Sequence, residues 1–190
     1  MSDLKQRLDE LKEYIQKKDF LEGDGLSNEE NIQMFCYDPK EEMAVRYFIE
    51  KLTTDPTLRC HLIECNLYRI FLQICEDKRI LNSIPSMEEK KGKEFIHKQL
   101  VRTASNKAFV EKIQYSPHEP GDVLIITGVG EAFPFIRVHS LLEAMQPAFP
   151  DVPIVVMYPG KFDGRDMSLF GKLKSNPYYR AFNNIQEVTK

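Results

Sequence analysis

The stretch GDVLIITGVG, residues 121–130, decides the fold of this chain. A glycine leads into a continuous apolar run, and two more glycines follow that run within four residues. An uninterrupted apolar run of this length is typical of a strand buried on both faces, as in a parallel sheet covered by helices. We therefore predict a buried strand that runs through a glycine turn toward a helix over residues 134–145.

Three further apolar runs lie outward from this stretch and predict the other strands: IQMFCY, LRCHLIECNL and VPIVVMYPG, at 32–37, 58–67 and 152–160. Amphipathic segments between them predict helices over 40–52, 68–75 and 87–113. In the first of these helices the residues expected to face inward are Met43, Tyr47 or Phe48, and Leu52. Strands that alternate with helices predict an α/β fold: a Rossmann-like, mostly parallel sheet of about four to five strands flanked by helices.

The first 31 residues differ in pattern from the remainder and predict an N-terminal amphipathic helix followed by an acidic hinge. The helix has an apolar seam spaced four, three and four residues apart, formed by Leu4, Leu8, Leu11 and Ile15. This seam either packs on the parent domain or receives a helix of a partner protein. We expect residues 1–31 to form a helical arm with its hinge, and residues 32–190 to form a single α/β domain.

Composition limits the function of the chain. It has 190 residues, and its 26 basic and 29 acidic side chains give a net charge of −3. This size suits one ordinary domain, and this charge argues against electrostatic capture of nucleic acid by the whole protein. Four cysteines without a C-x-x-C pair predict buried, reduced thiols. With no apolar run of membrane-spanning length, a cytoplasmic protein is expected.

The ends of the predicted strands are the first candidate site. Parallel strands end at the same edge of a sheet, where a small ligand would bind if one binds at all. The candidate residues of this strand-end crevice are Asp38, Lys40, Thr127, Gly128, Gly130 and Glu131. The turn at 127–131 is either a degenerate phosphate-binding turn or a structural turn. The second interpretation is favoured, because no lysine follows the second glycine and the Glu131 carboxylate would repel a phosphate.

A second candidate site lies after the last predicted strand, in what reads as the one locally basic stretch of the chain, residues 161–182. Arginine and tyrosine interleaved in this way favour a protein interface, although they also suit stacking on nucleic-acid bases. Folding back on the sheet is a third interpretation. The candidate interface residues are the helical seam together with Tyr158, Lys161, Asp163, Arg165, Tyr178, Tyr179 and Arg180.

Catalytic and metal-binding patterns are missing from the sequence. The four histidines show neither an H-x-x-x-H nor an H-E-x-x-H spacing, and no nucleophile is paired with a base. We expect neither a metal nor another cofactor.

Three segments resemble the BrxB family: TGVGEAFPFIR at 127–137, DVPIVVMYPGKFDG at 151–164 and LFGKLKSNPYYRAF at 169–182. The resemblance extends from about residue 35 to 182. It implies a small subunit of a bacterial bacteriophage exclusion (BREX) system. It also implies a non-enzymatic adaptor that docks the alkaline-phosphatase-like protein PglZ and the large ATPase, with no catalytic residue to carry over. The alternatives are a degenerate nucleotide-binding domain and an auxiliary DNA-binding subunit.

Overall fold

A computed structural model describes residues 3–22, 32–163, 165–173, 176–177 and 185. Its centre is a parallel sheet in the order β2-β3-β4-β1. The four strands are β1 (Ile32–Tyr37), β2 (His61–Asn66), β3 (Asp122–Thr127) and β4 (Ile154–Phe162). Two short strands, β5 (Asp166–Leu169) and β6 (Asn176–Pro177), extend the end of β4 in antiparallel pairing. The predicted fold class, a mostly parallel α/β sheet, is confirmed.

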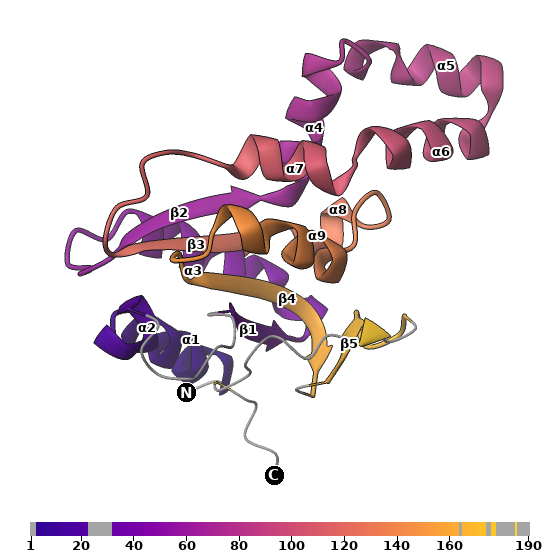
Figure 1. The fold of residues 1–190 in the computed structure, drawn as a ribbon. Helices are drawn as coiled ribbons and strands as arrows, with labels where there is room; N and C mark the ends of the chain where they lie inside the picture. Colours follow the sequence, from indigo (N-terminus) through magenta and orange to yellow (C-terminus); the bar gives the residue numbers. More distant parts are fainter. Residues whose placement is uncertain (1–2, 23–31, 164, 174–175, 178–184, 186–190) are drawn as a thin grey trace.

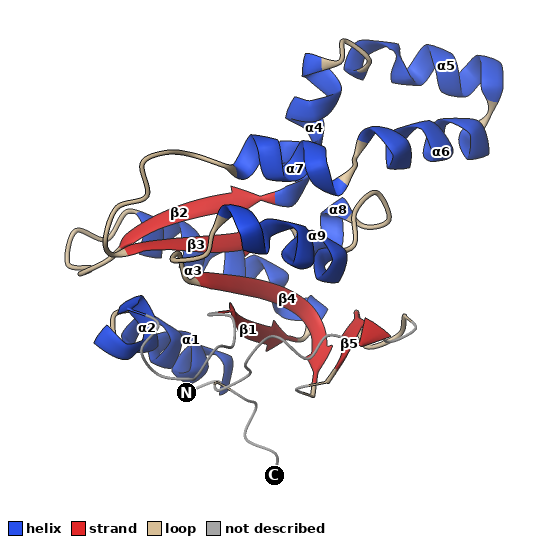
Figure 2. Ribbon diagram, in the orientation of Figure 1, coloured by secondary structure: helices blue, strands red, loops and turns tan. Residues whose placement is uncertain are grey.

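Helices cover both faces of this sheet (Figures 1 and 2). One face packs against α1 (Asp3–Tyr14), α2 (Lys18–Glu22) and α3 (Glu42–Thr53). The other face packs against α4 (Leu67–Asp77), α7 (Asn106–Ile113) and α9 (Val138–Met145). Side chains of successive strand residues point to opposite faces, so Phe35 belongs to the first core and Met34 to the second. β1 and β3, and β4 apart from Lys161, are buried on both faces as the continuous apolar runs predicted, whereas in the edge strand β2 only Cys65 is buried.

The single helix predicted over 87–113 is wrong. The segment forms α5 (Ile84–Lys91), α6 (Lys93–Thr103) and α7, after a short 3-10 helix η2 (Leu81–Ser83). Gly92 separates the first two helices with a φ of 82°, outside the helical region. Ser105 starts the third, because its side chain accepts a hydrogen bond from the Ala108 N–H. As a result α5 and α6 project from the body as a helical pair (Figure 1).

The inward face predicted for α3 is wrong in part. Leu52 is buried as expected, and of the alternatives Tyr47 and Phe48 it is Phe48 that packs half-buried against the core. Met43 is 73% exposed and Tyr47 is 62% exposed. At 100° per residue Met43 lies opposite Leu52 on the helix, so the two cannot share a buried face. Val45 and Ile49 share the face of Leu52 and are buried with it.

The helix predicted from residue 134 starts later than expected. A four-residue helix, α8 (Val129–Ala132), follows the glycine turn, and α9 begins only at Val138. Phe133 precedes a proline, which favours its extended conformation (φ −69°, ψ 136°) and ends α8.

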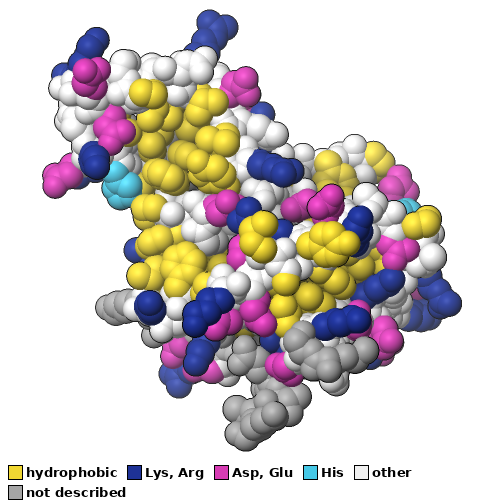
Figure 3. All heavy atoms as spheres, turned by 180° about the vertical axis from the view of Figure 1, so that it is seen from behind, with side chains coloured by type: hydrophobic (Ala, Val, Ile, Leu, Met, Phe, Trp, Pro, Cys, Tyr) yellow, Lys and Arg dark blue, Asp and Glu magenta, His cyan; other side chains and the backbone are white. Residues whose placement is uncertain are grey.

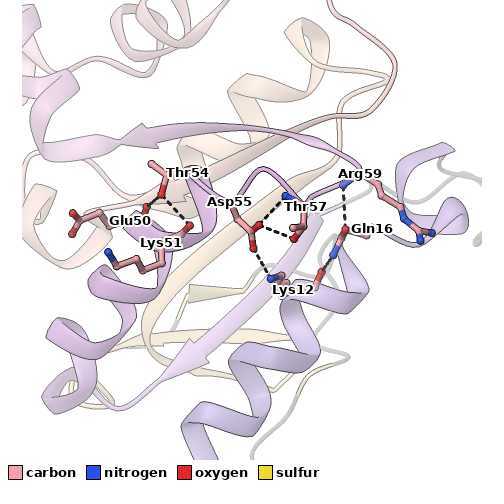
Figure 4. Close-up of polar contacts among 8 residues, drawn as sticks. All are labelled: Lys12, Gln16, Glu50, Lys51, Thr54, Asp55, Thr57 and Arg59. Atoms are coloured by element: carbon pink, nitrogen blue, oxygen red, sulfur yellow. Dashed lines mark hydrogen bonds and ion pairs between the residues drawn. The ribbon is translucent and has the colours of Figure 1, made fainter.

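The N-terminal helix packs on the chain's own domain, which is the first of the two alternatives for its apolar seam. All four seam residues are at most 6% exposed: Leu4, Leu8, Leu11 and Ile15. Lys12 Nζ lies 2.6 Å from Asp55 Oδ2 after α3, and Gln16 Oε1 accepts a hydrogen bond from the Arg59 N–H (Figure 4). The predicted hinge falls on residues 22–31, of which 23–31 lie outside the described residues.

All four cysteines are buried and free, as predicted. Burial raises the pKa of Cys65 to about 12, with a smaller contribution from the charge of Glu64, so this thiol stays protonated near neutral pH. None of the described helices combines the length and the apolar character that crossing a membrane requires.

Candidate functional site

A crevice of about 550 Å³ opens where the sequence predicted one, between α3 and the ends of β2 and β3. Three of the six predicted crevice residues line it: Thr127, Gly128 and Glu131. Exposed Met43 and Tyr47 also line it, so the side chains that α3 does not bury border this hollow. Figure 3 views the molecule from the α3 side and shows apolar and charged side chains mixed over this region.

The polar centre of the crevice is an ion-paired chain of side chains. The Tyr37 hydroxyl donates to Glu42 Oε2 at 2.6 Å, and Arg46 Nε lies 2.8 Å from Glu42 Oε1. Arg46 Nη2 reaches Glu131 Oε2 at 2.9 Å, which connects α3 to the glycine turn. Burial, and then the hydrogen bond to Glu42, raises the pKa of the Tyr37 phenol well above its usual value. The phenol therefore remains a proton donor throughout the physiological range.

The glycine turn is shaped by its neighbours in the fold. Gly128 adopts a left-handed φ of +67°, and a Cβ there would lie 2.8 Å from Asn66 Oδ1. The same oxygen accepts a hydrogen bond from the Arg69 N–H and caps α4. Thr127 Oγ1 donates to Glu64 Oε1 at 2.7 Å across the strand ends. These contacts fix the ends of β2 and β3 side by side.

The surroundings of the turn disfavour a phosphate. The crevice is lined by four glutamates, Glu42, Glu50, Glu64 and Glu131, against the guanidinium groups of Arg46 and Arg69. An anion would therefore meet a net negative charge. The four-residue α8 also has too few aligned peptide dipoles to offset that charge.

The other three predicted crevice residues have different positions. Asp38 Oδ1 accepts from the Lys40 N–H and caps the 3-10 helix η1 (Pro39–Glu41), which is a structural role. Neither Asp38 nor Lys40 lines the crevice. Gly130 faces away from it, since a Cβ there would lie 2.9 Å from the Phe170 ring. Gly130 thus allows β5 and its turn to approach α8 closely.

Of the four residues in the ion-paired chain, only Glu131 was a candidate from the sequence, and the other three were not: Tyr37, Glu42 and Arg46. Glu42 and Arg46 are four residues apart on α3, and this spacing is a recognisable signal for an ion pair on a helix surface. The contact from Arg46 to Glu131 joins residues far apart in the chain. Only the packing of α3 across the sheet brings them together.

A second hollow lies beside the β4–β5 hairpin. This hairpin pocket has a volume of about 250 Å³ and is mainly apolar, with Phe133, Tyr158, Met167 and Leu173 among its lining residues. On the same hairpin, Lys161 of β4 and Arg165 of the turn are exposed.

Asp163 holds the backbone of this turn in place. It accepts hydrogen bonds from the N–H groups of Asp166 and Arg165, and these bonds lower the pKa of its carboxyl. The carboxylate therefore stays ionised beside the exposed cations of the hairpin.

The predicted interface residues are thus distributed unevenly. Lys161 lies exposed on β4, and Asp163 and Arg165 lie exposed on the hairpin turn. Tyr158 is 3% exposed and lines the hairpin pocket. Tyr178, Tyr179 and Arg180 lie outside the described residues. The seam of α1 is covered by the chain's own core, so it offers no surface to a partner in this structure. Within the described ranges, no group of three or more His, Cys, Asp or Glu side chains is arranged to hold a metal ion.

Comparisons with known proteins identify relatives over almost the whole chain. The family model described as "BREX protein BrxB" matches residues 63–184. A protein named BREX protein BrxB from Bacillus cereus (strain H3081.97) is 39% identical over 98% of this chain and 100% of its own length. One of the same name from Escherichia coli O9:H4 (strain HS) is 28% identical, over 97% and 93% respectively. No solved structure matches. The chain belongs to the BrxB family, whose members are components of bacteriophage exclusion (BREX) defence systems.

Proposed function

We propose that this chain is a non-enzymatic adaptor of a BREX complex, which docks the alkaline-phosphatase-like subunit PglZ and also the large ATPase. Family membership supports a role within a system of several subunits. A chain of 190 residues has the size of one ordinary domain, which suits a subunit that brings others together.

The observation that carries this proposal is the surface of the β4–β5 hairpin. An apolar pocket of about 250 Å³ opens on this hairpin and has Arg137 in its lining, and Lys161 and Arg165 are exposed elsewhere on the same hairpin. A pocket that accepts an apolar anchor, with charged groups around it, is the usual arrangement of a protein-binding hot spot. Leu173, at 36% exposure, already presents apolar surface at the edge of this pocket.

The polar network of the strand-end crevice supports a structural role for the edge of the sheet where α/β enzymes hold their substrates. Arg46 is engaged by Glu42 and Glu131 at once, so its charge is neutralised within the chain. The network joins α3 to the glycine turn and holds the body of the adaptor together.

Co-purification tests the adaptor function. PglZ and the large ATPase of the same BREX system are expressed with the tagged chain, and the retained subunits are quantified. We expect the unaltered chain to retain PglZ. Lys161→Glu combined with Arg165→Glu, and separately Leu173→Glu, should weaken retention about tenfold, since each alters the surface around the hairpin pocket.

A matched control is Lys5→Glu combined with Arg59→Glu, which makes the same change in net charge at two exposed positions away from the hairpin. This control should retain PglZ as the unaltered chain does, and circular dichroism checks that every variant is folded. If the unaltered chain retains neither subunit, the adaptor function is wrong. If the unaltered chain retains a subunit and the hairpin variants retain it equally well, only the choice of surface is wrong.

A further inference from the structure

The α5–α6 pair stands apart from the sheet. In Figure 1 it projects from the body beyond α4 and α7. None of the residues of α5 is buried, although α5 carries Ile84 and Met87. Ile84 and Met87 pack against the core with one part of their surface and leave the other part exposed, and that exposed part is available for another contact.

Apolar side chains of this pair and of η2, which precedes it, form what we call the arm patch: Leu81, Ile84, Met87 and Phe95. The first three are only partly buried, and Phe95 is 41% exposed. Ile84 and Met87 are three residues apart and therefore share one face of α5. Figure 3 shows hydrophobic side chains spread over the projecting lobe, with Lys and Arg side chains at its edges.

The segment around the arm patch is strongly basic, a feature that the sequence prediction missed. Residues 78–112 hold nine Lys and Arg against four Asp and Glu, a net charge of +5, while the whole chain has −3. The stretch 161–182 is therefore not the one locally basic part of the chain. Lysines and arginines are spread thinly along three helices here, so no short window of sequence stands out.

Most of these basic side chains are not neutralised within the described residues. Ion pairs hold Lys107 with Glu111 and Lys112 with Asp77. The other seven form no salt bridge with a described residue: Lys78, Arg79, Lys90, Lys91, Lys93, Lys98 and Arg102. One of them, Lys91, lies with Nζ 5.9 Å above the Phe95 ring, so positive charge borders the arm patch directly.

We propose that the arm patch binds an acidic amphipathic helix of a protein partner. The apolar centre would receive the partner's apolar stripe, and the lysines around it would face the partner's Asp and Glu. A protein is favoured over nucleic acid because a phosphate backbone gains nothing from covering Ile84, Met87 and Phe95. This inference rests on the proposed adaptor function and gives the adaptor a docking surface separate from the hairpin.

Two variants of the full chain test the surface in the same co-purification. Lys90→Glu with Lys93→Glu reverses the charge around the arm patch, and Phe95→Ser removes an exposed apolar group at little risk to folding. Each should lower retention of one BREX subunit about tenfold, whereas Lys5→Glu with Arg59→Glu should lower it less than about twofold. Circular dichroism verifies that the variants are folded.

A photo-crosslinking amino acid in place of Phe95 tests the chemistry of the partner. We expect it to capture a segment of one subunit with net negative charge and apolar residues three and four positions apart. Capture of a basic or non-amphipathic segment, or of no protein, would overturn the proposal. Binding to DNA is tested by fluorescence anisotropy with a 30-base-pair duplex. If the unaltered chain binds the duplex and the variant with Lys90→Glu and Lys93→Glu does not, the proposal of a protein partner is also overturned.

The two proposals fail in different ways. If the unaltered chain retains no subunit, the adaptor function fails, and the arm patch is then judged by the cross-link alone. The other case is that the unaltered chain retains a subunit, that the arm-patch variants retain it equally, and that no protein is cross-linked. In that case only the arm patch is refuted. If the arm-patch variants lose one subunit and the hairpin variants lose another, both proposals are supported.

Discussion

Gly128 adopts a backbone conformation that other residues rarely enter, and the side chain of Asn66 occupies the space where its Cβ would lie. A left-handed φ costs a residue with a Cβ on the order of 1 kcal/mol. The Asn66 amide cannot move away freely, because its oxygen caps α4. One glycine thus joins the end of β3 to the beginning of the neighbouring helix.

We expect Gly128→Ala to lower the free energy of unfolding by about 2 to 3 kcal/mol, from the strained φ together with displacement of the cap. Gly171→Ala is the matched control, since Gly171 has a φ of +62° and a Cβ added there would meet nothing within 4 Å. It should lose only about 1 kcal/mol. Urea unfolding followed by far-UV circular dichroism measures both, because the chain contains no tryptophan. Equal losses in the free energy of unfolding for the two variants would mean that the clash of the added Cβ with Asn66 does not destabilise the protein.

At the residue scale, the glycine turn could be predicted from the sequence, but its partners could not. The two glycines and Glu131 stand in one short segment, so their place at a strand end follows from the apolar run before them. Arg46, which neutralises Glu131, lies 85 positions away and reaches it only through the folded sheet. Local sequence predicts caps and turns because their atoms are neighbours in the chain, but it carries no information about such a pair.

At the element scale, α1 is fixed to the body by a buried arginine. Arg7 is 3% exposed, and its Nη2 donates to the carbonyl oxygens of Cys36 and Ile185. Its guanidinium also lies 4.8 Å from the centre of the Phe35 ring. A single side chain therefore ties the first helix both to the end of β1 and to a residue near the C-terminus.

We expect Arg7→Met to destabilise the protein by about 2 kcal/mol. Methionine keeps most of the apolar stem but leaves two carbonyl groups without their charged donor. Lys5→Met, on the exposed side of the same helix, should change stability by less than about 0.5 kcal/mol. Urea unfolding of the two variants measures the difference, and a loss for Arg7→Met as small as that for Lys5→Met would show that the buried hydrogen bonds contribute nothing net.

The elements themselves were predictable where one physical signal dominated. β1 has the predicted bounds, because an apolar run buried on both faces has little ambiguity. The segment 84–113 was not predictable in the same way, because its apolar spacing fits a single long helix as well as three short ones. The breaks depend on the φ of Gly92 and on the Ser105 cap, and the positions of those helices depend on their packing.

At the scale of the whole molecule, the two cores are linked through the sheet. α1 belongs to the core on the α3 face, which also holds Phe35 from β1 and Val155 from β4. Those strands bury their alternate residues in the opposite core. Loss of one helical layer therefore exposes one side of the strands on which the other layer depends. This coupling predicts that the N-terminal arm and the body unfold together.

We expect Leu11→Asp to lower stability by about 4 kcal/mol or more and to do so for the whole chain. Leu11 is fully buried, so the variant removes an apolar side chain and places a carboxylate where water cannot reach it. Gln6→Asp introduces the same group on the exposed side of α1 and should cost less than about 0.5 kcal/mol. Far-UV circular dichroism reports the helices, and near-UV circular dichroism reports the tyrosines, all of which except Tyr14 lie outside α1. Coincident transitions at a lower urea concentration would confirm a single cooperative unit, whereas an early loss of helix signal alone would show that the arm is separable.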